Sequence, residues 1–114
     1  AKSKYNDINF FEQNIKNKIK IEDKFNIIIF SDILWYIFED IETCINNALE
    51  NLTNDGIIIF NNSMCVNQRY GKDKINGSSE LIAYFQKKFN VIDHFESEFI
   101  DRRNLCLITI KKYF

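Results

Sequence analysis

The segment Phe25–Ile37, FNIIIFSDILWYI, constrains the fold more than any other part of the chain. Its first six residues are mostly β-branched or aromatic, and they lack the alternation of a half-exposed strand. Such a run is typical of a parallel strand that helices cover on both faces. The run stops at Ser31 and Asp32 and gives way to a turn with Trp35 and Tyr36. We therefore expect the carboxyl end of this strand to meet a ligand.

The residues that flank this segment predict further strands and a helix. Ile8–Phe11 is a short apolar run with a polar end, which we interpret as a parallel strand. A helix with Asp40 as N-cap is predicted from apolar residues that share one helical face: Ile41, Cys44, Ile45, Ala48, Leu49 and Leu52. Thr53–Gly56 is expected to end this helix, with Gly56 at positive φ, before Ile57–Phe60 begins the next buried strand.

The second half of the chain predicts a loop, a helix and an antiparallel hairpin. Asn61–Gly77 is polar without a sustained period and is interpreted as a loop. Ser78 or Ser79 is expected to cap a helix that carries Leu81, Ile82, Phe85 and Phe89 on one face. Val91–Phe99 alternates apolar and polar residues, and Leu105–Ile110 returns as the last strand. The fold class is therefore α/β, with mostly parallel strands and a C-terminal antiparallel hairpin.

Composition narrows the functional classes. The chain of 114 residues carries 15 basic and 16 acidic residues, so the net charge of −1 gives nucleic-acid binding no electrostatic support. The longest apolar stretch is interrupted by Ser31 and Asp32 and is too short to span a bilayer, which needs about 20 residues. Three cysteines without short spacing and a single histidine, His94, predict neither a disulfide framework nor a metal site, and we expect a cytoplasmic protein.

Polar side chains follow three predicted strands at their carboxyl ends. These groups are Gln13–Ile15, Ser31–Tyr36 and Asn61–Met64. Strands commonly leave a core into polar loops, so each group alone has a purely structural explanation. Because ligands of open α/β sheets bind beyond the carboxyl ends of strands, three such groups in order favour a binding pocket.

The run FNIIIFSDILWYI, a following helix and then LTNDGIIIF resemble the fourth-strand and fifth-strand region of class I S-adenosylmethionine-dependent methyltransferases. The resemblance is strongest to the small-molecule branch that includes the nodulation N-methyltransferases. The closing hairpin is also similar to that family's sheet edge. The resemblance implies a Rossmann-like methyltransferase sheet, S-adenosylmethionine as cofactor and a small-molecule amine or hydroxyl as methyl acceptor.

The resemblance also implies which residues hold the cofactor. Asn14 stands where the family usually has an aspartate that accepts from the adenine amino group, and an asparagine carbonyl can accept the same bond. Ile15 would pack on the adenine. Ser31 and Asp32 match the positions whose backbone approaches the methionine part of the cofactor. Tyr36 matches a position that shapes the cofactor pocket, where an aromatic ring attracts the sulfonium cation.

The acceptor side of the pocket is expected to use residues beyond the two central strands. Trp35 matches a position that shapes this pocket, although plain core packing explains it equally well. Asn61, Asn62, Ser63 and Tyr70 could orient an acceptor. No residue stands out as a general base, so the catalytic residue is unknown. His94 lies within the alternating strand and is interpreted as a partly exposed structural residue.

The family's most specific motif, a GxGxG turn after the first strand, is not found in residues 1–114. Gly56, Gly71 and Gly77 form no such turn. We therefore interpret 1–114 as a single domain that is the C-terminal part of a methyltransferase domain and is inactive alone. Two alternatives stay open. One is a noncatalytic α/β interaction or regulatory module, and the other is a nucleotide-binding oxidoreductase, which leaves the SDILWY segment unexplained.

The resemblance has a consequence for assembly. In the family's strand order the first and second strands lie between the third and the fourth, so their loss would leave Phe25–Phe30 with an open apolar edge. Open edges pair readily with other chains. We expect a homodimer through this exposed sheet edge, rather than a rearranged monomer in which Ile8–Phe11 fills the edge.

Overall fold

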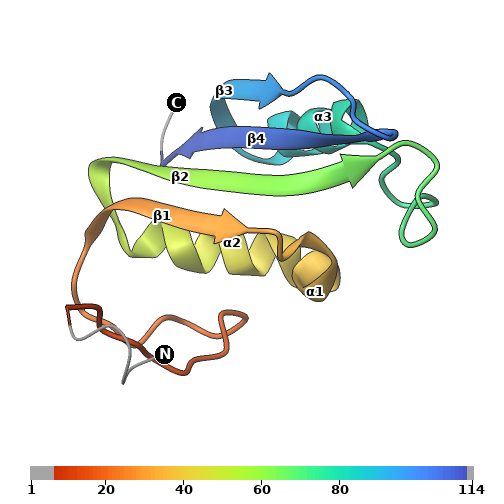
Figure 1. Cartoon of the computed structure of the whole chain (residues 1–114). Coiled ribbons are helices and arrows are strands. Elements are labelled where there is room, and N and C mark those ends of the chain that lie inside the picture. The colour runs from red at the N-terminus through yellow and green to blue at the C-terminus, as the bar shows by residue number, and fades with distance from the viewer. Residues whose placement is uncertain (1–6, 113–114) are drawn as a thin grey trace.

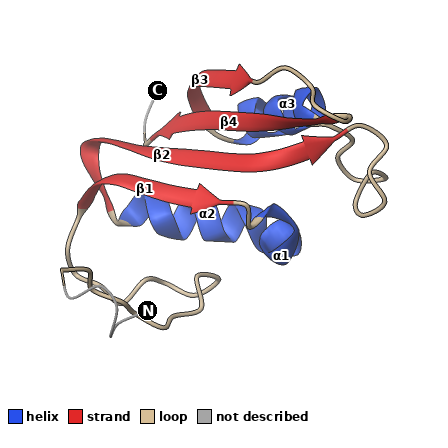
Figure 2. Cartoon of the chain, viewed as in Figure 1, coloured by secondary structure: helices blue, strands red, loops and turns tan. Residues whose placement is uncertain are grey.

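A computed structural model describes residues 7–112 of the chain. Figures 1 and 2 show one sheet with helices on one side of it and a long irregular segment before the first strand. The elements are β1 (Phe25–Ser31), α1 (Leu34–Ile37), the 3₁₀ turn η1 (Phe38–Asp40), α2 (Ile41–Glu50), β2 (Leu52–Cys65), α3 (Ser78–Lys88), β3 (Asn90–Glu96) and β4 (Arg103–Lys111).

The strand order is β1-β2-β4-β3. β1 pairs parallel with β2, and α2 connects them, as predicted. The other two pairs, β2 with β4 and β3 with β4, are antiparallel. The expected mostly parallel sheet is thus wrong for the described residues, because β4 inserts between β2 and β3 and contributes two antiparallel pairings. The predicted C-terminal hairpin is confirmed.

Ile8–Phe11 does not form the predicted strand. The segment is irregular, and Ile8 and Phe11 are exposed over 50% and 67% of their surfaces. An apolar run becomes a strand only where a neighbouring strand accepts its main-chain hydrogen bonds, and within residues 7–112 no strand pairs with it.

β2 is longer than the pattern indicates, at both ends. Leu52, predicted to lie on the apolar face of the preceding helix, is instead the first residue of this strand. The expected turn at Thr53–Gly56 is therefore part of the strand, and positive φ among glycines occurs at Gly71 and Gly77 instead of Gly56. The lack of a side chain at Gly56 lets the Leu52 side chain pack against its backbone, because a Cβ there would lie 2.8 Å from Leu52 Cγ. The strand also includes residues 61–65, predicted as loop, because they pair with Arg103–Leu107 of β4.

The helix caps also differ from the prediction. Gly77, with φ of 85°, takes the N-cap position of α3, and Ser78 donates its hydroxyl to Asn104 Oδ1 at 2.8 Å. Asp40 lies at the N-cap of α2 without a side-chain capping bond and forms an ion pair with Lys16 at 3.1 Å.

The core lies between the sheet and its two longer helices, α2 and α3, which Figure 1 shows behind the strands. Alternate residues of the central strands point into it, among them Ile58, Phe60, Ile108 and Ile110, all fully buried. Burial of each large apolar side chain contributes about 1.5–3 kcal/mol. The opposite face of β1 is uncovered, with Ile27 and Ile29 exposed over 55% and 60% of their surfaces. The core is therefore one-sided at β1.

Candidate functional site

The carboxyl ends of β1 and β2 lie side by side and share a hydrogen-bonded group of polar residues. Ser31 pairs with Asn61 in the parallel ladder, and Ser31 Oγ donates to Asn61 Oδ1 at 3.0 Å. The Asp32 N–H donates to the Asn61 carbonyl at 2.9 Å, and the Ser63 N–H donates to Asp32 Oδ1 at 2.8 Å. We name Ser31, Asp32, Asn61, Asn62 and Ser63 the strand-end cluster. The sequence predicted that these residues meet.

Asp32 turns the chain from β1 into α1. Its φ of 52° lies in the left-handed region, which costs a non-glycine residue about 1–2 kcal/mol. Aspartate visits this region more readily than most residues because its short side chain bonds locally. Here the side chain holds the Ser63 N–H across the strand end. Strain that surrounding bonds maintain is a frequent property of ligand sites.

Asn62 joins the strand-end cluster to α1 from within the core. It is only 4% exposed, and its Oδ1 accepts the N–H of Leu34, the first residue of α1, at 3.2 Å. Its Nδ2 donates to the Ser63 carbonyl at 3.1 Å. Burial leaves this side chain little surface for a ligand. Its geometry is that of a residue that positions α1, which carries Trp35 and Tyr36.

An aromatic pocket of about 290 Å³ lies beside α1. The Trp35 and Tyr70 rings meet edge to face at 5.6 Å, and Trp35 also contacts Phe38 at 5.6 Å. Gly71, with φ of 75°, packs directly on Trp35, since a Cβ there would lie 2.3 Å from Cζ3. The pocket is lined by Trp35, Phe38, Glu39, Arg69, Tyr70, Gly71, Asp73 and Lys74.

Charged groups rim the aromatic pocket. Lys74 Nζ forms an ion pair with Glu39 and lies 5.3 Å from the centroid of the Phe38 ring. The hydrogen bond with Glu39 raises the pKa of Lys74, which further favours the cationic form of this amine. Sequence reasoning selected Trp35 and Tyr70 but missed Phe38, Glu39 and Lys74. The only sequence signal for the pocket is Gly71 directly after Tyr70 in a polar loop.

Tyr36 and the pair Asn14–Ile15 lie apart from the aromatic pocket. Tyr36 projects into solvent with 85% of its surface exposed. Asn14 forms a local turn in which its Oδ1 accepts the Lys16 N–H at 3.1 Å. Asn47 of α2 donates to the Ile15 carbonyl at 3.2 Å, which holds this segment against α2. Within the described part of the chain, no hydrogen bond joins Asn14 or Ile15 to the strand-end cluster.

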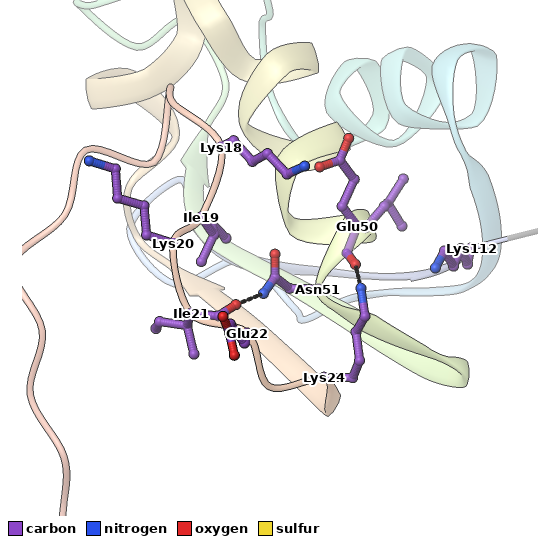
Figure 3. A pocket seen from close by; sticks show the side chains of 10 residues that line it. Lys18, Ile19, Lys20, Ile21, Glu22, Lys24, Glu50, Asn51 and Lys112 are labelled. Atoms are coloured by element: carbon purple, nitrogen blue, oxygen red, sulfur yellow. Dashed lines mark hydrogen bonds between the residues drawn. The ribbon is translucent and has the colours of Figure 1, made fainter.

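A second cavity, of about 1020 Å³, lies at the other end of β1 (Figure 3). Lysines line it, but two of them bond to main-chain carbonyls near the end of α2: Lys24 to Glu50, and Lys112 to Leu52 at 3.4 Å. The Asn51 amide donates to the Ile21 carbonyl at 2.7 Å. Lys24 thus satisfies a carbonyl at the C-terminus of α2, a structural arrangement, and Asn51 ties the segment before β1 to the end of that helix. We therefore assign this cavity to the packing of residues 18–24.

Other site types find little support. Among residues 7–112, no cluster of three or more histidine, cysteine or acidic side chains is arranged to hold a metal ion. His94 is exposed on β3, at the sheet edge farthest from β1. Cys44, Cys65 and Cys106 are free. None of the helices in the described range has the length and apolarity needed to cross a membrane.

The fold is shared with solved methyltransferases. The N-methyltransferase NodS from Bradyrhizobium japonicum WM9 matches with a TM-score of 0.61 and 13% identity, over 87% of this chain and 56% of that one. The same protein in complex with S-adenosyl-L-homocysteine matches with a TM-score of 0.61 and 16% identity, over 87% and 51%. TehB from Haemophilus influenzae matches with a TM-score of 0.57 and 17% identity, over 98% and 44%.

These likenesses define the class: the chain has part of a methyltransferase fold. The sequence profile of the nodulation protein S (NodS) family matches residues 1–111, and the chain therefore belongs to the NodS family. No curated protein matches the chain in sequence. The chain spans about half the length of the solved NodS chains.

Proposed function

We propose that this chain forms one wall of the active site of an S-adenosylmethionine-dependent methyltransferase that acts on a small-molecule amine or hydroxyl. The strand-end cluster is the observation that carries the proposal. It groups two exposed hydroxyls, a carboxylate and two amides where open α/β sheets bind ligands. Membership of the NodS family and the complex of a solved NodS protein with S-adenosyl-L-homocysteine support it.

Residues at the end of β1, in α1 and in the segment before β1 would bind the cofactor. Ser31 and Asp32 would hold the amino-acid end of the cofactor, and Asn14 and Ile15 would contact its adenine once the segment before β1 closes on it. Tyr36 would face the sulfonium, where a cation over an aromatic ring gains about 0.5–2 kcal/mol. When bound, the cofactor supplies an activated methyl group, so the protein mainly orients the two reactants and excludes water.

The acceptor would bind on the other side of the cluster. Asn61 and Ser63 offer polar groups there, and Trp35 and Tyr70 offer an aromatic wall. Asn62 would act through α1, because its side chain is buried. We assign no general base among these residues. An amine acceptor needs none if it arrives unprotonated, whereas a hydroxyl acceptor needs one.

A noncatalytic interaction or regulatory module is the second candidate. The chain carries no GxGxG turn and spans about half the length of the solved NodS chains. A module of this kind would keep the fold and lose cofactor binding.

Calorimetric titration with S-adenosyl-L-homocysteine separates the two candidates. The protein expressed from the complete gene is expected to bind one equivalent, whereas the 114-residue chain alone is expected to bind weakly or not at all. Lack of binding by the complete gene product would support the noncatalytic module. Tight stoichiometric binding by the isolated chain would show that a glycine-rich turn is not required.

We also infer that the 114-residue chain forms a homodimer through the exposed edge of its sheet. The exposure of Ile27 and Ile29 on β1, which pairs with β2 on one side only, supports this inference.

A further inference from the structure

The loop between β2 and α3, residues 66–77, is closed at its base by hydrogen bonds. The Asn67 N–H donates to Asn76 Oδ1 at 2.6 Å, and the Asn76 side-chain amide donates to Asn67 Oδ1 at 3.2 Å. The Gln68 amide donates to the carbonyl of Ile75, which is only 2% exposed. Loops whose ends are held together in this way are compact units. We name Asn67, Gln68, Ile75 and Asn76 the loop base and residues 69–74 the loop tip.

The loop tip lacks the contacts that fix the loop base. None of residues 69–74 is buried. The Gly71 carbonyl accepts the N–H groups of Lys74 and Ile75, both at 2.9 Å, so the tip bonds to itself and to its own base. In the described structure no main-chain hydrogen bond joins the tip to α1 or η1. A segment with so few buried contacts opens at a low cost in free energy.

Exposed side-chain contacts hold the loop tip against α1 and η1. The ion pair of Lys74 with Glu39 joins side chains that are 42% and 79% exposed. Tyr70, which is 66% exposed, meets the Trp35 ring edge to face, and Gly71 packs on the same ring. Exposed ion pairs stabilise weakly and are screened by salt. The attachment of the tip is therefore easily broken.

The position of the loop tip determines the shape of the aromatic pocket. Trp35, Phe38 and Glu39 line the pocket from α1 and η1, and every other lining residue belongs to the tip. Movement of the tip would thus remove one wall of the pocket and uncover the Trp35 ring. The loop base, which does not line this pocket, would stay in place.

We propose that the loop tip is a lid over the aromatic pocket and that the ion pair of Lys74 with Glu39 holds it closed. When the ion pair breaks, the tip lifts from Trp35 and opens the pocket to small molecules. Lids of this kind move on the microsecond to millisecond timescale. That the molecule admitted is the methyl acceptor rests on the proposed function, whereas the motion itself does not.

Acrylamide quenching of fluorescence tests access to the pocket, because Trp35 is the only tryptophan in the chain and acrylamide is small and uncharged. In the 114-residue chain, the quenching constant should rise as NaCl is raised from about 0.01 M to about 1 M, since salt screens the ion pair. Lys74→Gln should raise quenching at low salt and remove its salt dependence. Glu39→Gln should do the same, and the double variant should add nothing to either single variant.

Lys72→Gln is the matched control. It removes the same charge from the same loop tip, but Lys72 does not line the pocket. Both the quenching constant and its salt dependence should therefore stay as in the parent chain. Circular dichroism verifies that each variant folds.

Relaxation dispersion of the Trp35 indole N–H measures the motion directly. The parent chain should show microsecond to millisecond exchange at this signal. Loss of an exposed ion pair changes an equilibrium by up to about fivefold, so Lys74→Gln should raise the population of the open state by up to that factor.

Three outcomes would overturn the proposal. They are quenching that rises neither with salt nor in Lys74→Gln, equal effects of Lys74→Gln and Lys72→Gln, and an indole signal without exchange in the parent chain. If Lys74→Gln does not fold, the salt dependence and the exchange of the parent chain decide. None of these measurements involves S-adenosyl-L-homocysteine, so their failure is distinguishable from failure of the proposed function.

Discussion

Asn62 shows at the residue scale how the site depends on one buried amide. Its bond to the Leu34 N–H and its bond to the Ser63 carbonyl tie α1 to the end of β2. Asn62→Ala leaves a buried N–H without its partner, so we expect a loss of about 1–3 kcal/mol in the free energy of unfolding. Urea denaturation measures this loss.

Asn61→Ala is the matched control for that substitution. The Asn61 side chain bonds to the Ser31 hydroxyl in an exposed position, so its loss should cost less than about 1 kcal/mol. Equal destabilisation by the two variants would contradict the positioning role of Asn62.

Gly71 supports Trp35 through a close contact. A methyl group at residue 71 would overlap the indole ring, and the positive φ adds strain. Since Trp35 is the only tryptophan in the chain, Gly71→Ala should shift its fluorescence emission as the ring moves out of the aromatic pocket. Gly77→Ala is the control, because it has a similar φ of 85° but lies near Val66, so it should strain the backbone without changing the emission.

Residue types and their order predicted much of the site. Ser31, Asp32, Asn61 and Ser63 could be grouped because the carboxyl ends of neighbouring parallel strands meet at one sheet edge. The buried role of Asn62 could not be read from a run of three polar residues. The positions of Phe38 and Lys74 depend on how the loop after β2 folds back on α1. No local sequence pattern predicts the conformation of that loop.

At the scale of the elements, periodicity was informative where one face is buried. The apolar face of α2 and the hairpin of β3 and β4 follow from spacing alone. The extension of β2 through residue 65 does not, because polar residues become strand when another strand supplies their hydrogen bonds, and β4 does so here. For the opposite reason Ile8–Phe11 is irregular: its pattern is that of a strand, but it has no strand to pair with in residues 7–112.

The short helix α1 is the element that would present Tyr36 to a cofactor. Because the side chain is 85% exposed, Tyr36→Ala should change the free energy of unfolding by less than about 0.5 kcal/mol. In the protein expressed from the complete gene, it should lower affinity for S-adenosyl-L-homocysteine or for the acceptor. Calorimetric titration measures the effect. Unchanged affinities for S-adenosyl-L-homocysteine and for the acceptor would show that Tyr36 has no role in binding either ligand.

The whole molecule has a core on one side of β1 and exposed isoleucines on the other. A run with the composition of β1 predicts cover on both faces, yet the described structure supplies α2 and α3 on one face only. The sequence thus predicts a larger assembly than the chain itself provides. A second copy, a further part of a methyltransferase domain, or both would provide that cover.

The stability of the whole molecule should fall at alkaline pH because of Cys106. Burial raises the pKa of this thiol from 9.0 to about 11, against a smaller lowering by the hydrogen bond with Ser78. Above about pH 9 the unfolded chain releases the thiol proton while the folded chain retains it, so unfolding becomes more favourable as pH rises toward 11. A two-unit difference corresponds to a loss of about 2–3 kcal/mol, complete near the folded-state pKa.

Urea denaturation at about pH 8 and at about pH 10.5 measures this loss, and one fixed protein concentration removes concentration as a variable. Cys106→Ala removes the ionisable group, so its stability should fall less between the two pH values than that of the parent chain. Burial also raises the pKa of Cys44 and of Tyr84, and both groups contribute equally to the two proteins. An identical pH dependence in the parent chain and Cys106→Ala would show that the Cys106 thiol does not link protonation to folding.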